Sequence, residues 1–173
     1  SNLNYTTGQV VPNAVFAPLN ADGNVCIYTH ASTHLVVDVS GALAPGSRIF
    51  TVPPARLLET RQGPNNVTVD GAQQGFGPIG PPAMWRPVPL WRGGVSADAE
   101  LAILNVTAIA PDRPGHLTIW PCDGEPPVAS NVNYVAGQVV ANLAIAEISN
   151  SDDFASHACV YSFGRSDVVI DVV

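Results

Sequence analysis

The C-terminal part of the chain alternates between apolar and polar positions in short runs that predict β-strands. In HLTIW, Leu117 and Ile119 fall on one face of an extended segment. In DVVIDVV, Val168, Ile170 and Val172 share one face in the same way. Clusters of Pro, Gly and Asp separate such runs, as turns separate antiparallel strands. The pattern predicts an all-β antiparallel sandwich of jelly-roll or immunoglobulin-like type.

Three other segments add detail to this prediction. LAILNVTAI (101–109) and NLAIAEI (142–148) are apolar at both parities, so we expect strands that are covered on both faces. NVTV (66–69) is predicted to be a further strand. In AMWRPVPLW the two prolines share a parity with the tryptophans, which predicts an edge strand, because proline cannot donate a ladder hydrogen bond.

The chain contains an internal repeat with a period of about 130 residues. SNLNYTTGQVVPNAVFAPL (1–19) returns as SNVNYVAGQVVANLAIAEI (130–148), and VCIYTHASTHLVVDV (25–39) returns as ACVYSFGRSDVVIDV (158–172). Two unrelated strands would not keep polar residues in register over this length. The pairs in register include Asn2/Asn131, Asn4/Asn133, Gly8/Gly137, Gln9/Gln138, Asn13/Asn142, Cys26/Cys159 and Asp38/Asp171.

The period also predicts the domain boundaries. Residues 48–173 hold one complete β-sandwich repeat, and residues 1–40 correspond to the C-terminal half of a preceding repeat. GALAPGS (41–47), which consists mostly of small residues, is predicted to link them.

Composition and charge exclude two classes of partner. The 173 residues carry a net charge of -7, and the seven basic residues are scattered, so we expect no nucleic-acid binding. No apolar run approaches the roughly 18 residues that span a bilayer, so no membrane insertion is expected. A surface rich in Pro, Gly, Thr and Asn with only 12% charged residues favours an extracellular or cell-surface location.

Several motifs resemble tandem β-domain repeats of secreted actinobacterial proteins. The motifs that carry the resemblance are PARLLETR (54–61), GVSADA (94–99), LNVTA (104–108), GHLTIWP (115–121) and the two SN-x-NY segments. The chain departs from the family pattern at Glu59, where the pattern has Asp. The resemblance implies an accessory β-domain on an exported protein, and it implies no activity.

Three cysteines are an odd number for an exported chain. The resembling repeats carry a pair at the positions of Cys122 and Cys159, so we expect these two to form a disulfide. Cys26 is the repeat copy of Cys159, and it is predicted to be unpaired or to bond between molecules. A zinc site and two buried thiols are the alternatives, although no C-x-x-C motif supports a zinc site.

The sequence contains no recognisable catalytic arrangement. The four histidines lack the HExxH spacing, and no GxSxG motif supplies a nucleophile. Asp22 and the pair Asp152 and Asp153 lie in loops that do not match a calcium-binding pattern, so we interpret them as turn residues. We expect no enzymatic activity, no cofactor and no metal.

Two groups of residues are candidates for binding or structural roles. Arg56, Glu59 and Arg61 form the densest charged motif and are predicted to be a structural clamp, with an anion site as the alternative. Amide and aromatic side chains are predicted to cap turns and fill the core, or alternatively to face a sugar ligand. The residues in this second group are Trp85, Trp91, Trp120, Asn131, Asn133 and Gln138.

The leading hypothesis is a non-catalytic structural or interaction module that associates with copies of itself or with neighbouring repeats. The alternative is a carbohydrate-binding module for cell wall or polysaccharide. Because residues 1–40 are half of a repeat, something must cover their apolar strands. We expect either packing on residues 48–128 of the same chain or strand addition to a neighbouring chain, which would build a head-to-tail filament.

Overall fold

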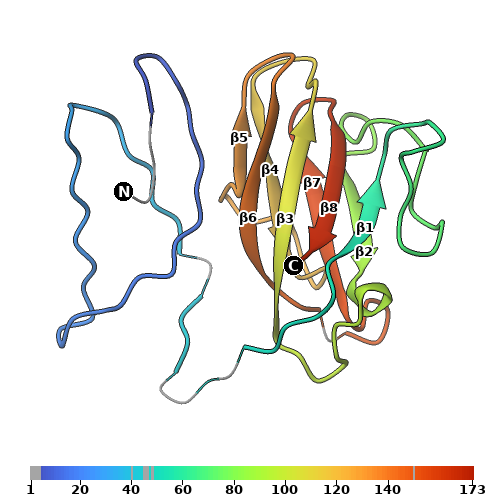
Figure 1. Cartoon of the computed structure of the whole chain (residues 1–173), viewed down its shortest axis with the longest axis horizontal. Coiled ribbons are helices and arrows are strands. Elements are labelled where there is room, and N and C mark those ends of the chain that lie inside the picture. Colours follow the sequence, from blue (N-terminus) through green and yellow to red (C-terminus); the bar gives the residue numbers. More distant parts are fainter. Residues whose placement is uncertain (1–4, 40, 45–46, 48, 150) are drawn as a thin grey trace.

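A β-sandwich forms the folded body of this protein, whose structure is a computed structural model (Figure 1). The described residues are 5–39, 41–44, 47, 49–149 and 151–173. Within them, the strands and the one short 3-10 helix are β1 (Ala55–Glu59), β2 (Trp85–Pro89), η1 (Leu90–Gly93), β3 (Leu101–Ile109), β4 (Gly115–Trp120), β5 (Val132–Tyr134), β6 (Val139–Glu147), β7 (His157–Ser162) and β8 (Asp167–Val172).

The strands form two antiparallel sheets with the orders β1-β8-β3-β6 and β2-β7-β4-β5. Four of the pairs, β1–β8, β2–β7, β3–β6 and β4–β5, make one long hairpin that has its tip between β4 and β5. The remaining pairs, β3–β8 and β4–β7, form when this hairpin rolls up. Of the two predicted types of sandwich, this topology is the jelly roll.

The two sides of the hairpin correspond to the two halves of the sequence repeat. We call β1 to β4 (residues 55–120) the first arm and β5 to β8 (residues 132–172) the second arm. Every strand pairs only with strands of the opposite arm. Neither arm can therefore satisfy its ladder hydrogen bonds without the other.

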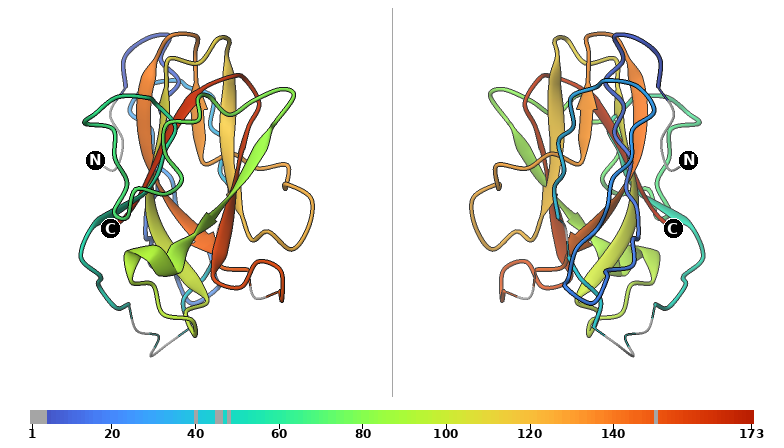
Figure 2. Two further views of the ribbon diagram at one scale, coloured as in Figure 1. Left: turned by 90° about the vertical axis from the view of Figure 1, so that its right-hand side faces the viewer. Right: turned by 90° about the vertical axis from the view of Figure 1, so that its left-hand side faces the viewer.

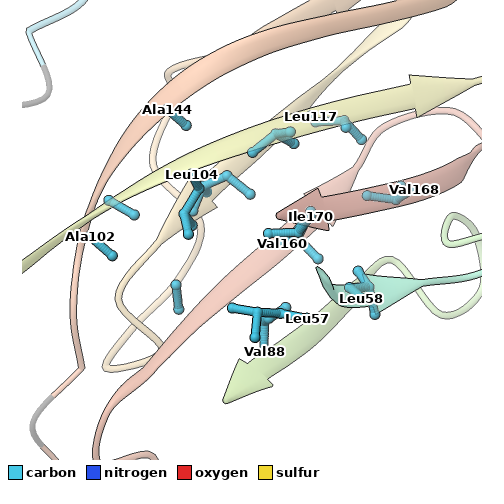
Figure 3. Close-up of a cluster of buried hydrophobic side chains, with 14 of the residues drawn as sticks. Leu57, Leu58, Val88, Ala102, Leu104, Leu117, Ala144, Val160, Val168 and Ile170 are labelled. Atoms are coloured by element: carbon cyan, nitrogen blue, oxygen red, sulfur yellow. The ribbon is translucent and has the colours of Figure 1, made fainter. Parts of the chain in front are cut away.

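The core lies between the two sheets, which face each other in Figure 2. Alternate residues of β3, including Leu104 and Val106, point into it, as do Leu117 from β4, Val160 from β7 and Ile170 from β8 (Figure 3). Both arms contribute fully buried side chains, so burial of apolar surface depends on both arms just as strand pairing does.

Two details of the sequence predictions are wrong. The strands β3 and β6 are fully buried on one face only: the outward positions of β3 are half-exposed, as are Leu143 and Ile145 of β6. Residues 66–69 are not a strand: Val69 donates one backbone hydrogen bond to Arg56 of β1, and the nitrogen of Thr68 donates to the side chain of Gln74 within the loop. The predicted edge strand is confirmed, since β2 borders its sheet.

The copy of the second arm at the N-terminus forms no strand in its described part, residues 5–39. We call this segment the free arm. It runs as an extended loop beside the sandwich (Figure 1), and none of its described residues is buried. The described part of the predicted linker, residues 41–44 and 47, also lacks regular structure. Residues 1–4, 40, 45–46 and 48 lie outside the described residues, so the boundaries predicted there are not described.

Two valines at the same repeat position offer a matched measure of core burial. Val172 is 2% exposed, whereas its copy Val39 in the free arm is 86% exposed. We expect Val172→Ala to lower the free energy of unfolding by roughly 1–3 kcal/mol, through lost burial and a residual cavity. Val39→Ala should change it by less than about 0.5 kcal/mol. Urea denaturation of both variants measures the difference, and equal effects would contradict the assignment of the core.

Candidate functional site

The free arm is an apolar segment whose side chains lie in solvent at positions that are buried in the sandwich. Ile27 is 54% exposed and its copy Val160 is 0% exposed. Val37, the copy of the buried Ile170, is also exposed. These side chains are apolar, as core residues are, but no first arm packs against them. Of the two predicted ways to cover residues 1–40, packing on the same chain buries none of the described residues 5–39, and strand addition to a neighbouring chain stays a prediction.

One local feature of the second arm is nevertheless formed in the free arm. Gly8 and Gly137 both adopt a positive φ, at 80° and 72°. The side-chain oxygen of Gln9 accepts a hydrogen bond from the nitrogen of Thr6 at 2.9 Å, and Gln138 accepts one from Val135 at 3.0 Å. A glycine and an amide three residues from its partner are enough to close this turn locally. The free arm thus has its turn and lacks its strands.

The two copies of this turn lie near each other. Residues 8–12 and the side chains of Val135, Gln138 and Val140 line an open hollow of about 420 Å³. This hollow lies beside the edge strand β6. The free arm therefore lies next to the sandwich here, although its residues are not buried.

The expected disulfide joins the two arms. Cys122 follows β4 of the first arm, Cys159 lies in β7 of the second arm, and their sulfur atoms are bonded with a Cα–Cα distance of 5.2 Å. In the chain-entropy description, a bridge across this separation of 37 residues contributes roughly 3–4 kcal/mol. Cys26, the repeat copy of Cys159, is a free and exposed thiol.

The predicted clamp residues come together around a buried carboxylate. Glu59 has a fully buried side chain at the end of β1, and its backbone bonds Gln73 and Gly75 of the following loop. Its Oε2 accepts hydrogen bonds from Arg56 at 3.0 Å and from Arg61 at 2.8 Å. Arg56 also donates to Asp171 of β8 at 2.9 Å, which links the first arm to the second. Because each of these charged groups is paired with another protein group, the cluster serves as a structural tie that holds the two arms together.

Burial is the largest single influence on Glu59, and it raises the pKa of that carboxyl. The hydrogen bonds from Arg61 and the charges of Arg61 and Arg56 outweigh it, so that the pKa of Glu59 lies below its ordinary value. The carboxylate is therefore charged at neutral pH inside the protein.

A second tie was not predicted from the sequence. The side chain of Arg92, in η1, is 3% exposed. It donates to Asp70 and to the backbone oxygens of Leu57 and Ala72 at 2.9 Å each. These contacts fasten the loop of residues 60–84 to β1. Nothing in the spacing of these residues along the chain indicates that they meet.

The amide residues that were candidate ligand groups hold backbone atoms or neighbouring side chains. The Asn131 oxygen accepts a hydrogen bond from the nitrogen of Ile119 at 2.7 Å, and Asn142 donates to the backbone oxygen of Asn131 at 2.6 Å. Gln138 closes the turn described above. Asn133 donates to Ser130 at 3.0 Å and lies opposite His116 on the outer face of its sheet.

Aromatic side chains gather on the outer face of the β2-β7-β4-β5 sheet. Trp85 is 48% exposed and lies edge-to-face against both Trp120 and Phe154, with ring centroids 6.4 Å apart in each case. Trp85, Trp120 and Tyr161 line a hollow of about 350 Å³, together with Met84 and the disulfide. Trp120 itself is buried, and its indole nitrogen donates to the backbone oxygen of Gly124.

The aromatic row continues across the sheet. His116 contacts Tyr161 and stacks on Phe163 with ring centroids 5.5 Å apart, and Arg113 lies over the Phe163 ring. Burial lowers the pKa of His116, which favours its neutral form. We call Trp85, Tyr161, His116 and Phe163 the aromatic face. Phe163 belongs to this face although no sequence pattern indicated it, and Trp91 lies outside the face, in η1.

No arrangement of metal-ligating residues occurs in the part of the chain that the structure describes: no three His, Cys, Asp or Glu side chains group together there. Asp22, Asp152 and Asp153 lie in turns. Among the same residues, no helix has the length and apolar character needed to cross a membrane.

Comparisons with protein-family models, with curated proteins and with solved structures give no match for this chain.

The buried carboxylate of Glu59 gives a test of the clamp. Glu59→Gln removes the anion of Arg61 and one of the two anions of Arg56, which keeps Asp171. We expect the free energy of unfolding at pH 7 to fall by roughly 1.5–3 kcal/mol, through lost charged hydrogen bonds. Because the folded pKa of Glu59 is lowered, the stabilisation is present above its unfolded pKa of about 4.3 and is lost as the pH falls through the folded pKa.

The gap between wild type and Glu59→Gln should accordingly narrow below about pH 4 in urea denaturation experiments. Glu147→Gln, at an exposed position of β6, is the matched control and should change stability by less than about 0.5 kcal/mol. A gap of the same size at pH 3 and pH 7 would contradict a charged Glu59.

Proposed function

We propose that this chain is a non-catalytic structural and interaction module of an extracellular protein, and that the free arm is its binding element. The free arm associates by strand complementation: it takes the place of β5 to β8 in a jelly roll whose first arm is supplied from a neighbouring repeat or another chain. A disulfide such as Cys122–Cys159 is consistent with an oxidising compartment.

The observation that carries this proposal is the contrast between two copies of one sequence. The copy that has an opposite arm forms four strands with a buried apolar face, and the copy that has none forms no strands in its described residues. Exposed apolar residues with unpaired backbone groups bind other strands readily, as in donor-strand complexes. The turn at Gly8 is already closed, so part of the ordering cost of binding is already met.

Deletion of residues 1–40 tests the role of the free arm. Since all the buried core residues lie between Leu57 and Val172, we expect the remaining chain to fold with a Tm within a few degrees of that of the full chain. A polypeptide of residues 48–129, refolded with each protein, should co-elute with the full chain and not with the truncated one. An unfolded truncated chain would show that residues 1–40 belong to the same core, and equal capture by both proteins would exclude the free arm as the binding element.

The aromatic face supports a second candidate function, binding of a neutral polysaccharide. Sugar rings stack on exposed aromatic side chains, and Trp85 beside the hollow offers such a surface. Of the two exposed tryptophans, Trp85 lies on the aromatic face and Trp91 does not, so each serves as the control for the other.

If this face binds polysaccharide, Trp85→Ala should weaken retention on insoluble cell-wall polysaccharide by about tenfold or more, because the ring loses its stacking surface. Trp91→Ala should leave retention unchanged. Co-sedimentation of each variant with the polysaccharide measures the effect. Absence of binding by the wild-type chain, or an equal loss in both variants, would reject this candidate.

A further inference from the structure

The number of first arms, compared with the number of second arms, limits which partners can bind the free arm. Residues 1–173 carry one first arm, within residues 48–129, one second arm, within residues 130–173, and a sequence copy of the second arm, within residues 1–40. One jelly roll uses one arm of each kind, because strands pair only across the arms. Copies of residues 1–173 therefore hold twice as many second arms as first arms. Exchange among these residues leaves, on average, one second arm per copy without a first arm.

We infer that the partner of the free arm is a first arm that has no second arm of its own, and that Cys26 forms a disulfide with it. This inference rests on the proposed function and names its partner. It departs from the head-to-tail filament of identical chains that the sequence suggested. The partner is a polypeptide segment with the pattern of β1 to β4, attached to this chain or carried by another.

The register of the repeat identifies the apolar contacts of this partner. Val37 takes the position of Ile170, which lies in β8 between β1 and β3, and Ile27 takes the position of Val160, which lies in β7 between β2 and β4. Both free-arm residues are exposed, and both counterparts are at most 1% exposed. A single strand or a sheet edge would cover one of these positions only, so the free arm needs all four strands of a first arm.

Two polar contacts make the partner more specific. Asp38 is the copy of Asp171, which accepts a hydrogen bond from Arg56 at 2.9 Å, so the partner carries an arginine in that position of its β1. Cys26 is the copy of Cys159, which is bonded to Cys122 directly after β4, so the partner carries a cysteine there. Asp38 and Cys26 are both exposed in this chain.

The covalent step needs an oxidant, for which oxidised glutathione serves. The thiolate of Cys26 attacks it and forms a mixed disulfide, and one molecule of reduced glutathione leaves. The partner cysteine then attacks the Cys26 sulfur and releases a second molecule of reduced glutathione. The two protein thiols lose two electrons and two protons in total, and the glutathione disulfide takes them up.

A fusion protein tests the inference with the full chain intact. A second copy of residues 48–129 is placed before Ser1, so that the junction of Ala129 and Ser1 reproduces the natural junction of Ala129 and Ser130. After refolding with oxidised and reduced glutathione, we expect amide exchange in residues 25–39 to slow to the level of residues 158–172 in the same molecule. The free thiol of Cys26 should disappear, and peptide mapping without reductant should find Cys26 bonded to the added copy of Cys122.

Two variants of the fusion separate the possible failures. With Cys26→Ser the strands should remain protected while the added Cys122 stays a free thiol. With Val37→Asp, protection should be lost in residues 25–39 and retained in residues 158–172. Protection together with a free Cys26 thiol would overturn the disulfide and leave the proposed function standing. No protection of residues 25–39 in the unmodified fusion would overturn both.

The count of arms is tested separately with the unfused chain. Light scattering at rising concentration, with and without reductant, measures assembly, and amide exchange measures protection of residues 25–39. Together they should show no growing assembly in which residues 25–39 become protected from exchange. Addition of a free polypeptide of residues 48–129 should protect them if a first arm on another chain suffices. Protection in the fusion alone would restrict the partner to a segment of the same chain. Filaments of the unfused chain with protected residues 25–39 would overturn the inference and support self-assembly.

Discussion

Pairing between the two arms is the constraint on which the rest of this structure depends. In most sheets a hairpin within one half of the chain can form first and serve as a template. Here no strand of β5 to β8 has a partner in its own arm, so half of the repeat has no sheet to form alone. The behaviour of residues 5–39 agrees with this, since a segment with the same sequence pattern remains extended and exposed.

The polar ties of the sandwich lie where they hold one arm to the other. Arg56 reaches Asp171 across the β1–β8 pair, and Cys122 is bonded to Cys159 beside the β4–β7 pair. The Asn131 side chain bonds the backbone of β4. Each contact can form only when the two arms are paired in the correct register. Once formed, each contact stabilises the paired state. These contacts therefore favour pairing with an arm that carries the matching residues, and they also stabilise the pair once it has formed.

Sequence patterns predicted the parts of this structure that repeat or alternate. Period-two alternation at residues 117–119 and 168–172 predicted strands, and the internal repeat predicted the two halves. The same patterns did not show which strand pairs with which, because register between distant strands leaves no local signal. For this reason the jelly roll could not be separated from an immunoglobulin-like sandwich.

The features that were not predicted, or were predicted wrongly, also depend on contacts between distant segments. The contact of Arg92 with Asp70 and the aromatic face both join segments that are far apart in the chain. The apolar pattern of β3 suggested cover on both faces, whereas only its inward positions are fully buried and its outward positions are half-exposed. Residues 66–69 have strand-like composition, yet they lie in a loop. The nitrogen of Thr68 donates to the side-chain oxygen of Gln74, and its hydroxyl donates to the backbone oxygen of Ala72. Tertiary context overrides propensity in each case.

An exposed apolar arm is also an aggregation hazard, and the free arm differs from its copy in a way that limits this hazard. Pro12 and Pro18 stand at the positions of Ala141 and Glu147 in β6. Since β6 is an edge strand, proline is tolerated there and removes donors from the open edge. The strands that would correspond to the inner β7 and β8 contain no proline, so they keep every donor. The prolines thus leave the free arm able to enter a jelly roll as its inner strands while they hinder growth of the sheet beyond it.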